Sequence, residues 1–304
     1  MKKTLLFIII SIIMTSLFGC SRDLEKSKSN IILSQDFGDQ KIYDEKLDFA
    51  KDTTVMEFIE SNLDVKTENG FIDSINGIKS EYSQENKLGW FYYINGNLAQ
   101  VSPYDYYLKP GDDVVWDYHT WENEIYITSI IGSYPKNFTN GYNGKKLKTE
   151  ILYSKKFKKD TDELYDYLKN NGADDLVKKD INEGYYNDEK INTVFIGTWS
   201  EISKIQNIKD VYNDKKGELF FEIENKVKAL DCSKNIAKEF KKAAVIASLP
   251  KGYSSLSNIW IVTGNSDEMI KKALNILYEN PEKIKAKFSA IITEDEIFNI
   301  PMIK

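Results

Sequence analysis

The sequence predicts an α+β protein of 304 residues whose two halves are built differently. In the first half, short segments of alternating apolar and polar residues surround one amphipathic helix, which predicts a mixed sheet with a helix across it. In the second half, continuous apolar runs alternate with helical patterns, which is typical of an α/β layer. A connector rich in Gly, Asn and aromatic residues, 135–147, separates a domain at residues 30–134 from a domain at residues 148–304.

Residues 1–19 have the features of a bacterial lipoprotein signal peptide. Lys2 and Lys3 precede an apolar stretch, 5–13, that is too short for a comfortable membrane span. The sequence Leu17-Phe18-Gly19-Cys20 resembles a lipobox. We expect cleavage before Cys20, lipidation of its thiol, a polar tether over 20–29, and anchoring at the extracellular face of a Gram-positive cell membrane. An ordinary secretory signal with a chance cysteine is the alternative.

Charge and cysteine content exclude several classes of protein. The chain has 41 basic and 47 acidic residues, and loss of Lys2 and Lys3 would leave 39 basic residues and a net charge of about −8. An acidic protein is not expected to bind nucleic acid. Once Cys20 is lipidated, Cys232 is the remaining cysteine, so neither an internal disulfide nor a metal site of paired cysteines is expected. We interpret Cys232 as structural.

The order of elements in the first half follows from local patterns. Alternating residues at 31–33 and 42–49 predict a hairpin. Thr54 and Glu57 form a capping box for a helix with one apolar face. Asn76-Gly77 and Asn95-Gly96 are turn signals between further strands, expected at 70–75, 90–94, 114–118 and 125–131. A hairpin, a helix and a second hairpin in this order is the β-grasp pattern.

The second half predicts buried strands followed by helices. Strands are expected at 148–153, 191–196, 219–223, 227–230 and 259–262, and helices at 161–179 and from Ser200, Ser233 and Ser266. The segments TVFIGTWSEISKI and IWIVTGNSDEMIKKA both read as buried strand, glycine turn, Ser cap and helix, which predicts a duplicated β-α-β-β unit. Their glycine turns lack the spacing of phosphate-binding loops, so we interpret them as strand-to-helix turns.

One aromatic stretch, residues 89–121, organises the first half: GWFYYINGNLAQVSPYDYYLKPGDDVVWDYHTW. Its motifs W-x-Y-x-I-N-G and L-K-P-G-D-x-V-x-W-x-Y resemble the transcobalamin-like C-terminal domain, the β-rich half of the vertebrate cobalamin carriers, which also occurs in bacterial surface lipoproteins. The resemblance spans residues 30–134. It implies capture of cobalamin or a related corrinoid and delivery to an uptake transporter. The chain lacks the helical barrel that makes most cobalt contacts in the vertebrate carriers, so the domain supplies half of a cleft.

The aromatic side chains exceed what a small core is expected to bury, and amphipathic rings suit a flat ligand or a macromolecular surface. We expect Trp90 and Trp116 to pack on the helix from Thr54, and Tyr92, Tyr104, Tyr106 and Trp121 to be exposed. The candidate ligand-binding residues are Tyr92, Asn95, Tyr104, Tyr106, Trp116, Tyr118, His119 and Trp121. His119 reads either as a loop-tip residue stacked on Trp121 or as an imidazole ligand for a corrinoid cobalt or another metal.

Catalysis finds little support in the sequence. His119 is the only histidine, and no G-x-S-x-G motif surrounds a serine. A hydrolase could use the carboxylates of Asp112, Asp113, Glu122 and Glu124. We favour the simpler interpretation that these residues form turns or lie on solvated surfaces. We therefore expect no enzyme and no catalytic cofactor. The sequence predicts an anchored extracellular lipoprotein that binds a corrinoid in an aromatic-lined cleft between its domains. The alternative is a surface module that binds a protein or glycan through its aromatic face.

Overall fold

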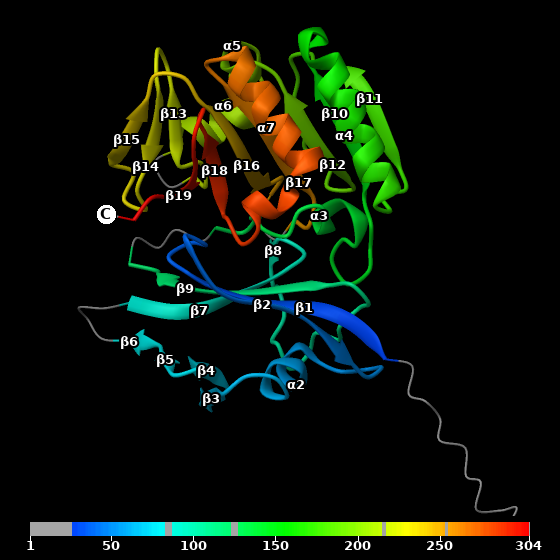
Figure 1. Cartoon of the computed structure of the whole chain (residues 1–304), viewed down its shortest axis with the longest axis vertical. Coiled ribbons are helices and arrows are strands. Elements are labelled where there is room, and N and C mark those ends of the chain that lie inside the picture. Colours follow the sequence, from blue (N-terminus) through cyan, green and yellow to red (C-terminus); the bar gives the residue numbers. More distant parts are fainter. Residues whose placement is uncertain (1–25, 83–86, 123–126, 215–216, 253–254, 304) are drawn as a thin grey trace, which may run out of the picture.

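The computed structural model describes residues 26–82, 87–122, 127–214, 217–252 and 255–303. The signal peptide, Cys20 and Glu124 lie outside these residues. The two halves of the chain are stacked along the long axis of the molecule, with the connector between them (Figure 1). The α+β class predicted from the sequence is confirmed. Within the described residues, no helix has the length and apolarity needed to cross a membrane.

The first half is a mixed sheet with one short helix across it, as predicted. The strand order is β2-β1-β9-β7-β6, with β8 paired to β7. β1 runs parallel to β9, and the other neighbours are antiparallel. The strand bounds are β1 (Ser27–Gln35), β2 (Gln40–Phe49), β6 (Glu81–Tyr82), β7 (Lys87–Ile94), β8 (Asn97–Leu98) and β9 (Asp113–Thr120). β1 begins within the segment expected to be a tether.

Helix α2 (Val55–Glu60) begins at the predicted capping box. The Glu57 N–H donates to Thr54 Oγ1 at 3.2 Å, and the Thr54 N–H donates to Glu57 Oε2 at 2.8 Å. Beside α2, to its left in Figure 1, lies a small antiparallel sheet of β3 (Val65–Glu68), β4 (Phe71–Ile75) and β5 (Ile78–Lys79).

Both faces of the main sheet are covered, because alternate residues of each strand enter different cores. Tyr92, Ile94, Val114 and Trp116 pack with α2, and Trp90 packs against the same core, which confirms the expectation for the two tryptophans. Residues of the opposite phase, among them Tyr93 and Val115, pack against the second half of the chain.

The second half is a seven-stranded sheet in the order β11-β10-β12-β17-β16-β18-β19. β11, β10, β12 and β17 are parallel, and the remaining pairs are antiparallel. The bounds are β10 (Lys148–Tyr153), β11 (Leu176–Asp180), β12 (Ile191–Ile196), β16 (Ala244–Pro250), β17 (Asn258–Gly264), β18 (Ser289–Ile292) and β19 (Ile297–Ile300).

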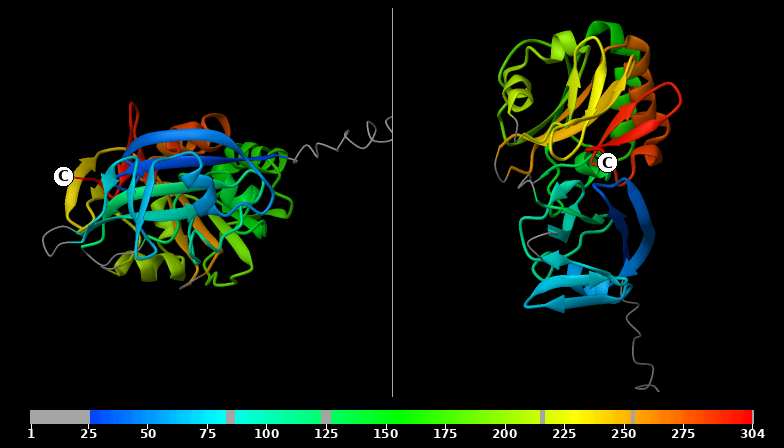
Figure 2. Two further views of the ribbon diagram at one scale, coloured as in Figure 1. Left: turned by 90° about the horizontal axis from the view of Figure 1, so that it is seen from below. Right: turned by 90° about the vertical axis from the view of Figure 1, so that its left-hand side faces the viewer.

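Helices cover both faces of this sheet (Figure 2). One face carries α4 (Lys158–Asn170) and α7 (Asp267–Glu279). The other carries α5 (Trp199–Ile202), α6 (Gln206–Asn213) and a small antiparallel sheet of β13 (Phe221–Ile223), β14 (Val227–Leu230) and β15 (Ile236–Phe240). Short helical turns lie at α3 (Lys136–Thr139), η1 (Lys155–Phe157) and η2 (Pro281–Ile284).

Four predicted elements are wrong or incomplete. The helix expected at 161–179 ends at Asn170, because Gly172 has a φ of +100° and residues from Leu176 onward pair with β10. The helix expected from Ser233 is instead strand β15, since the Asp231 carboxylate accepts the Ser233 and Asn235 N–H groups in a tight turn. The single helix from Ser200 is two short helices. The strand expected at 125–131 is only an isolated bridge at Ser129 among the described residues.

The predicted duplication is present in element order but not in space. β12-α5/α6-β13-β14 and β17-α7-β18-β19 both read β-α-β-β. The hairpin β18-β19 joins the seven-stranded sheet, whereas β13-β14 forms a separate sheet with β15. The two copies are therefore not equivalent layers.

The two halves meet in a closely packed interface. Phe288 contacts the rings of Phe37, Tyr93 and His119 at 5.6, 5.3 and 5.5 Å between centroids. The backbones come so close that a Cβ on Gly38 would lie 2.0 Å from the Ala286 carbonyl oxygen, so glycine is required there. Asn299 Nδ2 donates to the Phe37 carbonyl at 2.9 Å. These contacts fill the space where a cleft between the domains was expected.

Candidate functional site

The structure buries most of the residues that the sequence marked as ligand-binding. Tyr92, Asn95, Tyr106, Trp116 and His119 are 8, 0, 3, 2 and 4% exposed. The expected exposure of Tyr92 and Tyr106 is therefore wrong, and the cause is the double covering of the sheet. Tyr104 is exposed as expected, at 44%. Tyr118 and Trp121 are half-buried, and the Lys87 ammonium lies over the Trp121 ring.

Asn95 and Tyr106 belong to a buried polar network that holds the connector. Asn95 Nδ2 donates to Asp112 Oδ1 at 2.7 Å and to the Gly141 carbonyl at 2.6 Å. The Tyr106 hydroxyl donates to Asp112 Oδ2 at 3.2 Å and accepts the Asn143 N–H at 2.9 Å. Burial raises the pKa of Asp112, and hydrogen bonds from Lys109, Asn95 and Tyr106 oppose that rise. Asp112 thus accepts hydrogen bonds that hold the connector against the first half.

His119 is neither at a loop tip nor on Trp121. It lies within β9, and its ring stacks between Phe37 and Phe91 at centroid distances of 4.4 and 4.3 Å. Its Nδ1 lies 2.7 Å from Asp117 Oδ1. With both ring faces covered and only 4% of the residue exposed, the imidazole is buried in the described structure and is not open to a bulky ligand. No cluster of three or more His, Cys, Asp or Glu that could hold a metal occurs in the described part of the chain.

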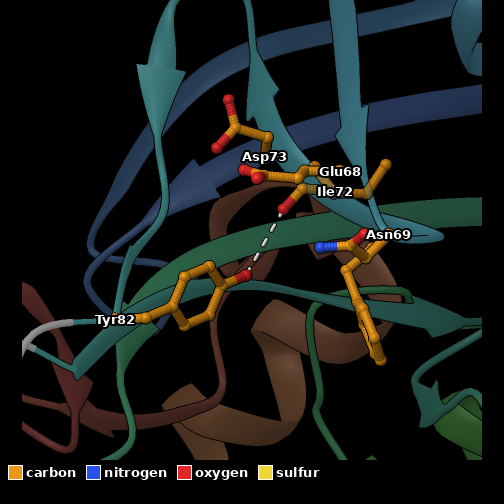
Figure 3. Close-up of a pocket in the computed structure, with 6 residues that line it drawn as sticks. Glu68, Asn69, Ile72, Asp73 and Tyr82 are labelled. Atoms are coloured by element: carbon orange, nitrogen blue, oxygen red, sulfur yellow. Dashed lines mark hydrogen bonds between the residues drawn. The ribbon is translucent and has the colours of Figure 1, made fainter.

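A groove on the first half is a candidate surface site. It has a volume of about 490 Å³ and is lined by Glu68, Asn69, Phe71, Ile72, Asp73 and Tyr82. Tyr82 lies on one side and Asn69 on the other, with Asp73 and Glu68 between them (Figure 3). The Phe71 and Tyr82 side chains are 73 and 64% exposed. The groove thus combines two exposed aromatic rings with two carboxylates and one amide. We call these six residues the aromatic groove.

Neighbouring side chains fix the shape of the aromatic groove. The Tyr118 hydroxyl donates to the Lys79 carbonyl at 2.7 Å, and Trp90 Nε1 donates to the Ile78 carbonyl at 3.1 Å. These two bonds fasten β5 to the main sheet. The Ser80 hydroxyl donates to the Ile72 carbonyl at 3.2 Å. Tyr118, predicted to bind ligand, therefore positions the groove and does not line it.

Sequence reasoning missed all six residues of the groove. One signal was available in strand β4, where Ile72 and Ser74 face inward and Phe71 and Asp73 are more exposed. An aromatic residue on the outward phase of a strand, just after the Asn69-Gly70 turn, indicates an exposed ring. The prediction instead placed the binding residues in the longer aromatic stretch that follows, residues 89–121.

Comparison with known proteins places the aromatic groove inside a recognised domain. Residues 52–120 match a family described as a domain of unknown function, DUF4430. This range runs from the start of α2 to the end of β9 and is consistent with the transcobalamin-like resemblance. No curated protein matches the chain.

A solved structure from Ruminococcus gnavus, described as that of a candidate metal binding protein, also matches. It is 16% identical, and the match covers 30% of this chain and 95% of that chain with a TM-score of 0.25. This score is too low to support any argument about fold or function.

Proposed function

We propose that this protein is a non-enzymatic, lipid-anchored extracellular binding protein that captures a corrinoid in its aromatic groove. The observation that carries the proposal is the pair of exposed rings, Phe71 and Tyr82, beside the Glu68 and Asp73 carboxylates. All of them fall within residues 52–120. The lipid anchor rests on the signal sequence that ends at Cys20.

The chemistry of the groove suits a corrinoid. A corrin macrocycle is broad and apolar on its faces and carries primary amides around its rim. Exposed rings can pack on such a face, and carboxylates accept hydrogen bonds from amide N–H groups. A groove of about 490 Å³ is smaller than a corrinoid, so part of the ligand would remain uncovered. A second protein, such as an uptake transporter, would then cover the exposed part.

The alternative is a module that docks a glycan or a protein. Its support is the exposure of the groove's aromatic rings, together with the packing of Phe288 on His119 at the interface between the halves. Exposed aromatic rings beside carboxylates are also suited to a sugar face. In this case the protein binds no corrinoid.

Titration of the purified full chain with cyanocobalamin and hydroxocobalamin tests the proposal. Tryptophan quenching and the visible spectrum would report binding. We expect saturable binding that weakens by about tenfold or more in Phe71→Ala and Tyr82→Ala, because aromatic contacts dominate such interfaces. Tyr185→Ala is the matched control, since Tyr185 is 59% exposed in the second half of the chain.

Two results would reject corrinoid capture in the groove: no saturable binding of either cobalamin, or binding that is equally strong in both groove variants. Binding of cell-wall glycan that is lost in Phe71→Ala, without cobalamin binding, would favour the alternative.

A further inference from the structure

A second, smaller pocket lies where the connector meets the second half of the chain. It has a volume of about 220 Å³. Asn137, Tyr142 and Lys145 line it from the connector, and Glu189, Asn192 and Ser255 line it from the second half. We call it the connector pocket. None of these residues contributes to the aromatic groove.

The walls of the connector pocket are held in place by buried contacts. Asn95 fastens Gly141 and Tyr106 fastens Asn143, as described above, and the Tyr106 and Tyr142 rings meet edge to face at 5.2 Å. On the other side, Asn192 Oδ1 accepts the Asn258 N–H at 3.0 Å. Asn95 and Tyr106, which the sequence marked as candidate ligand-binding residues, therefore help to shape the connector wall of this pocket.

The pocket has charged groups of both signs at its rim. At the rim, neither Lys145 nor Glu189 has an ion-pair partner among the residues that the structure describes. One positively charged and one negatively charged side chain thus line one small pocket.

We infer that the connector pocket binds a small zwitterion of amino-acid size. The ligand carboxylate would face the Lys145 ammonium, and the ligand ammonium would face the Glu189 carboxylate. A volume of about 220 Å³ corresponds to roughly seven water molecules of liquid, which admits an amino acid and excludes a corrinoid. This inference does not depend on the proposed function of the groove.

Calorimetric titration of the full chain with each of the common L-amino acids tests the inference. We expect at least one of them to bind with a dissociation constant of about 1 mM or below. Acetate and ethylamine, which carry one charge each, should bind more weakly than that amino acid. Lys145→Gln and Glu189→Gln should each weaken binding by about tenfold, because each removes a charged hydrogen-bonding group. Both side chains are exposed, so the variants should fold normally.

The matched controls are Lys190→Gln and Glu183→Gln, which remove like charges from exposed residues that do not line the pocket. Their binding should equal that of the unmodified chain. Absence of binding by every amino acid would overturn the inference, as would binding that is unchanged in Lys145→Gln and Glu189→Gln. Loss of cobalamin binding in Phe71→Ala with amino-acid binding intact would show that the two sites are separate.

Discussion

Asp113 allows a quantitative test of the buried electrostatics. It begins β9, is 4% exposed, and its Oδ1 accepts a hydrogen bond from Asn30 Nδ2 at 2.5 Å. Burial raises the pKa of its carboxyl group from 3.8 to about 6, against the opposing effects of Lys136, Asn30 and Lys285. The carboxylate form is therefore disfavoured in the folded protein.

The expected effect on stability follows from the direction of this pKa change. Between pH 3.8 and about 6 the folded protein holds a proton that the unfolded chain has released. Stability from this group is therefore fully present below pH 3.8 and is lost as the pH rises to about 6. The difference between the two pKa values corresponds to about 3 kcal/mol, since one pH unit is worth about 1.4 kcal/mol.

Asp113→Asn removes the titration while keeping the size of the side chain and an acceptor for Asn30. Urea denaturation at pH 4 and pH 7 would give the free energy of unfolding of both proteins. We expect the variant to gain about 2 kcal/mol relative to the unmodified chain between the two pH values, because part of the roughly 3 kcal/mol is already lost at pH 4. Asp48→Asn is the control, because Asp48 is an exposed partner in a surface ion pair with Lys28 at 3.5 Å. A pH dependence that is the same in Asp113→Asn and the unmodified chain would refute this reasoning.

Three further substitutions test the interface, the helix and the support of the groove. Phe288→Ala should lower the free energy of unfolding, measured by urea denaturation, by about 3–5 kcal/mol, because it removes a buried ring from the interface. Phe71→Ala, at a 73% exposed residue, should leave the free energy of unfolding nearly unchanged. Equal effects of the two substitutions would contradict the interface described here. Thr54→Ala should cost about 1 kcal/mol in the same assay, because it removes the capping box of α2, and a stability equal to that of the unmodified chain would argue against the cap. Tyr118→Phe should cost about 1 kcal/mol and weaken ligand binding in the aromatic groove, since the bond to the Lys79 carbonyl is lost; cobalamin affinity that stays unchanged would show that β5 needs no such support.

Much of the first half could be predicted from local patterns alone. The turn at Asn95-Gly96 has positive φ angles of 51 and 84°, as the Asn-Gly signal indicates, and the capping box at Thr54 starts α2. Such features depend on a few neighbouring residues, so the sequence determines them directly. The period-two strands Lys87–Ile94 and Asp113–Thr120 and their division into two faces were predictable for the same reason.

Whether those faces meet water or other protein was decided only by the tertiary structure. The surplus of aromatic residues suggested an exposed binding face, yet Tyr93 and Phe91 are covered by the second half and Tyr92 and Trp116 by the α2 side. Strand β15 shows the same limit, because the spacing of its apolar residues predicted a helix, whereas the segment pairs with β14 as a strand. The aromatic groove was missed because it requires β4 and Tyr82 of β6 to lie together. Burial and strand pairing join segments distant in sequence, and no local pattern states which segments will meet.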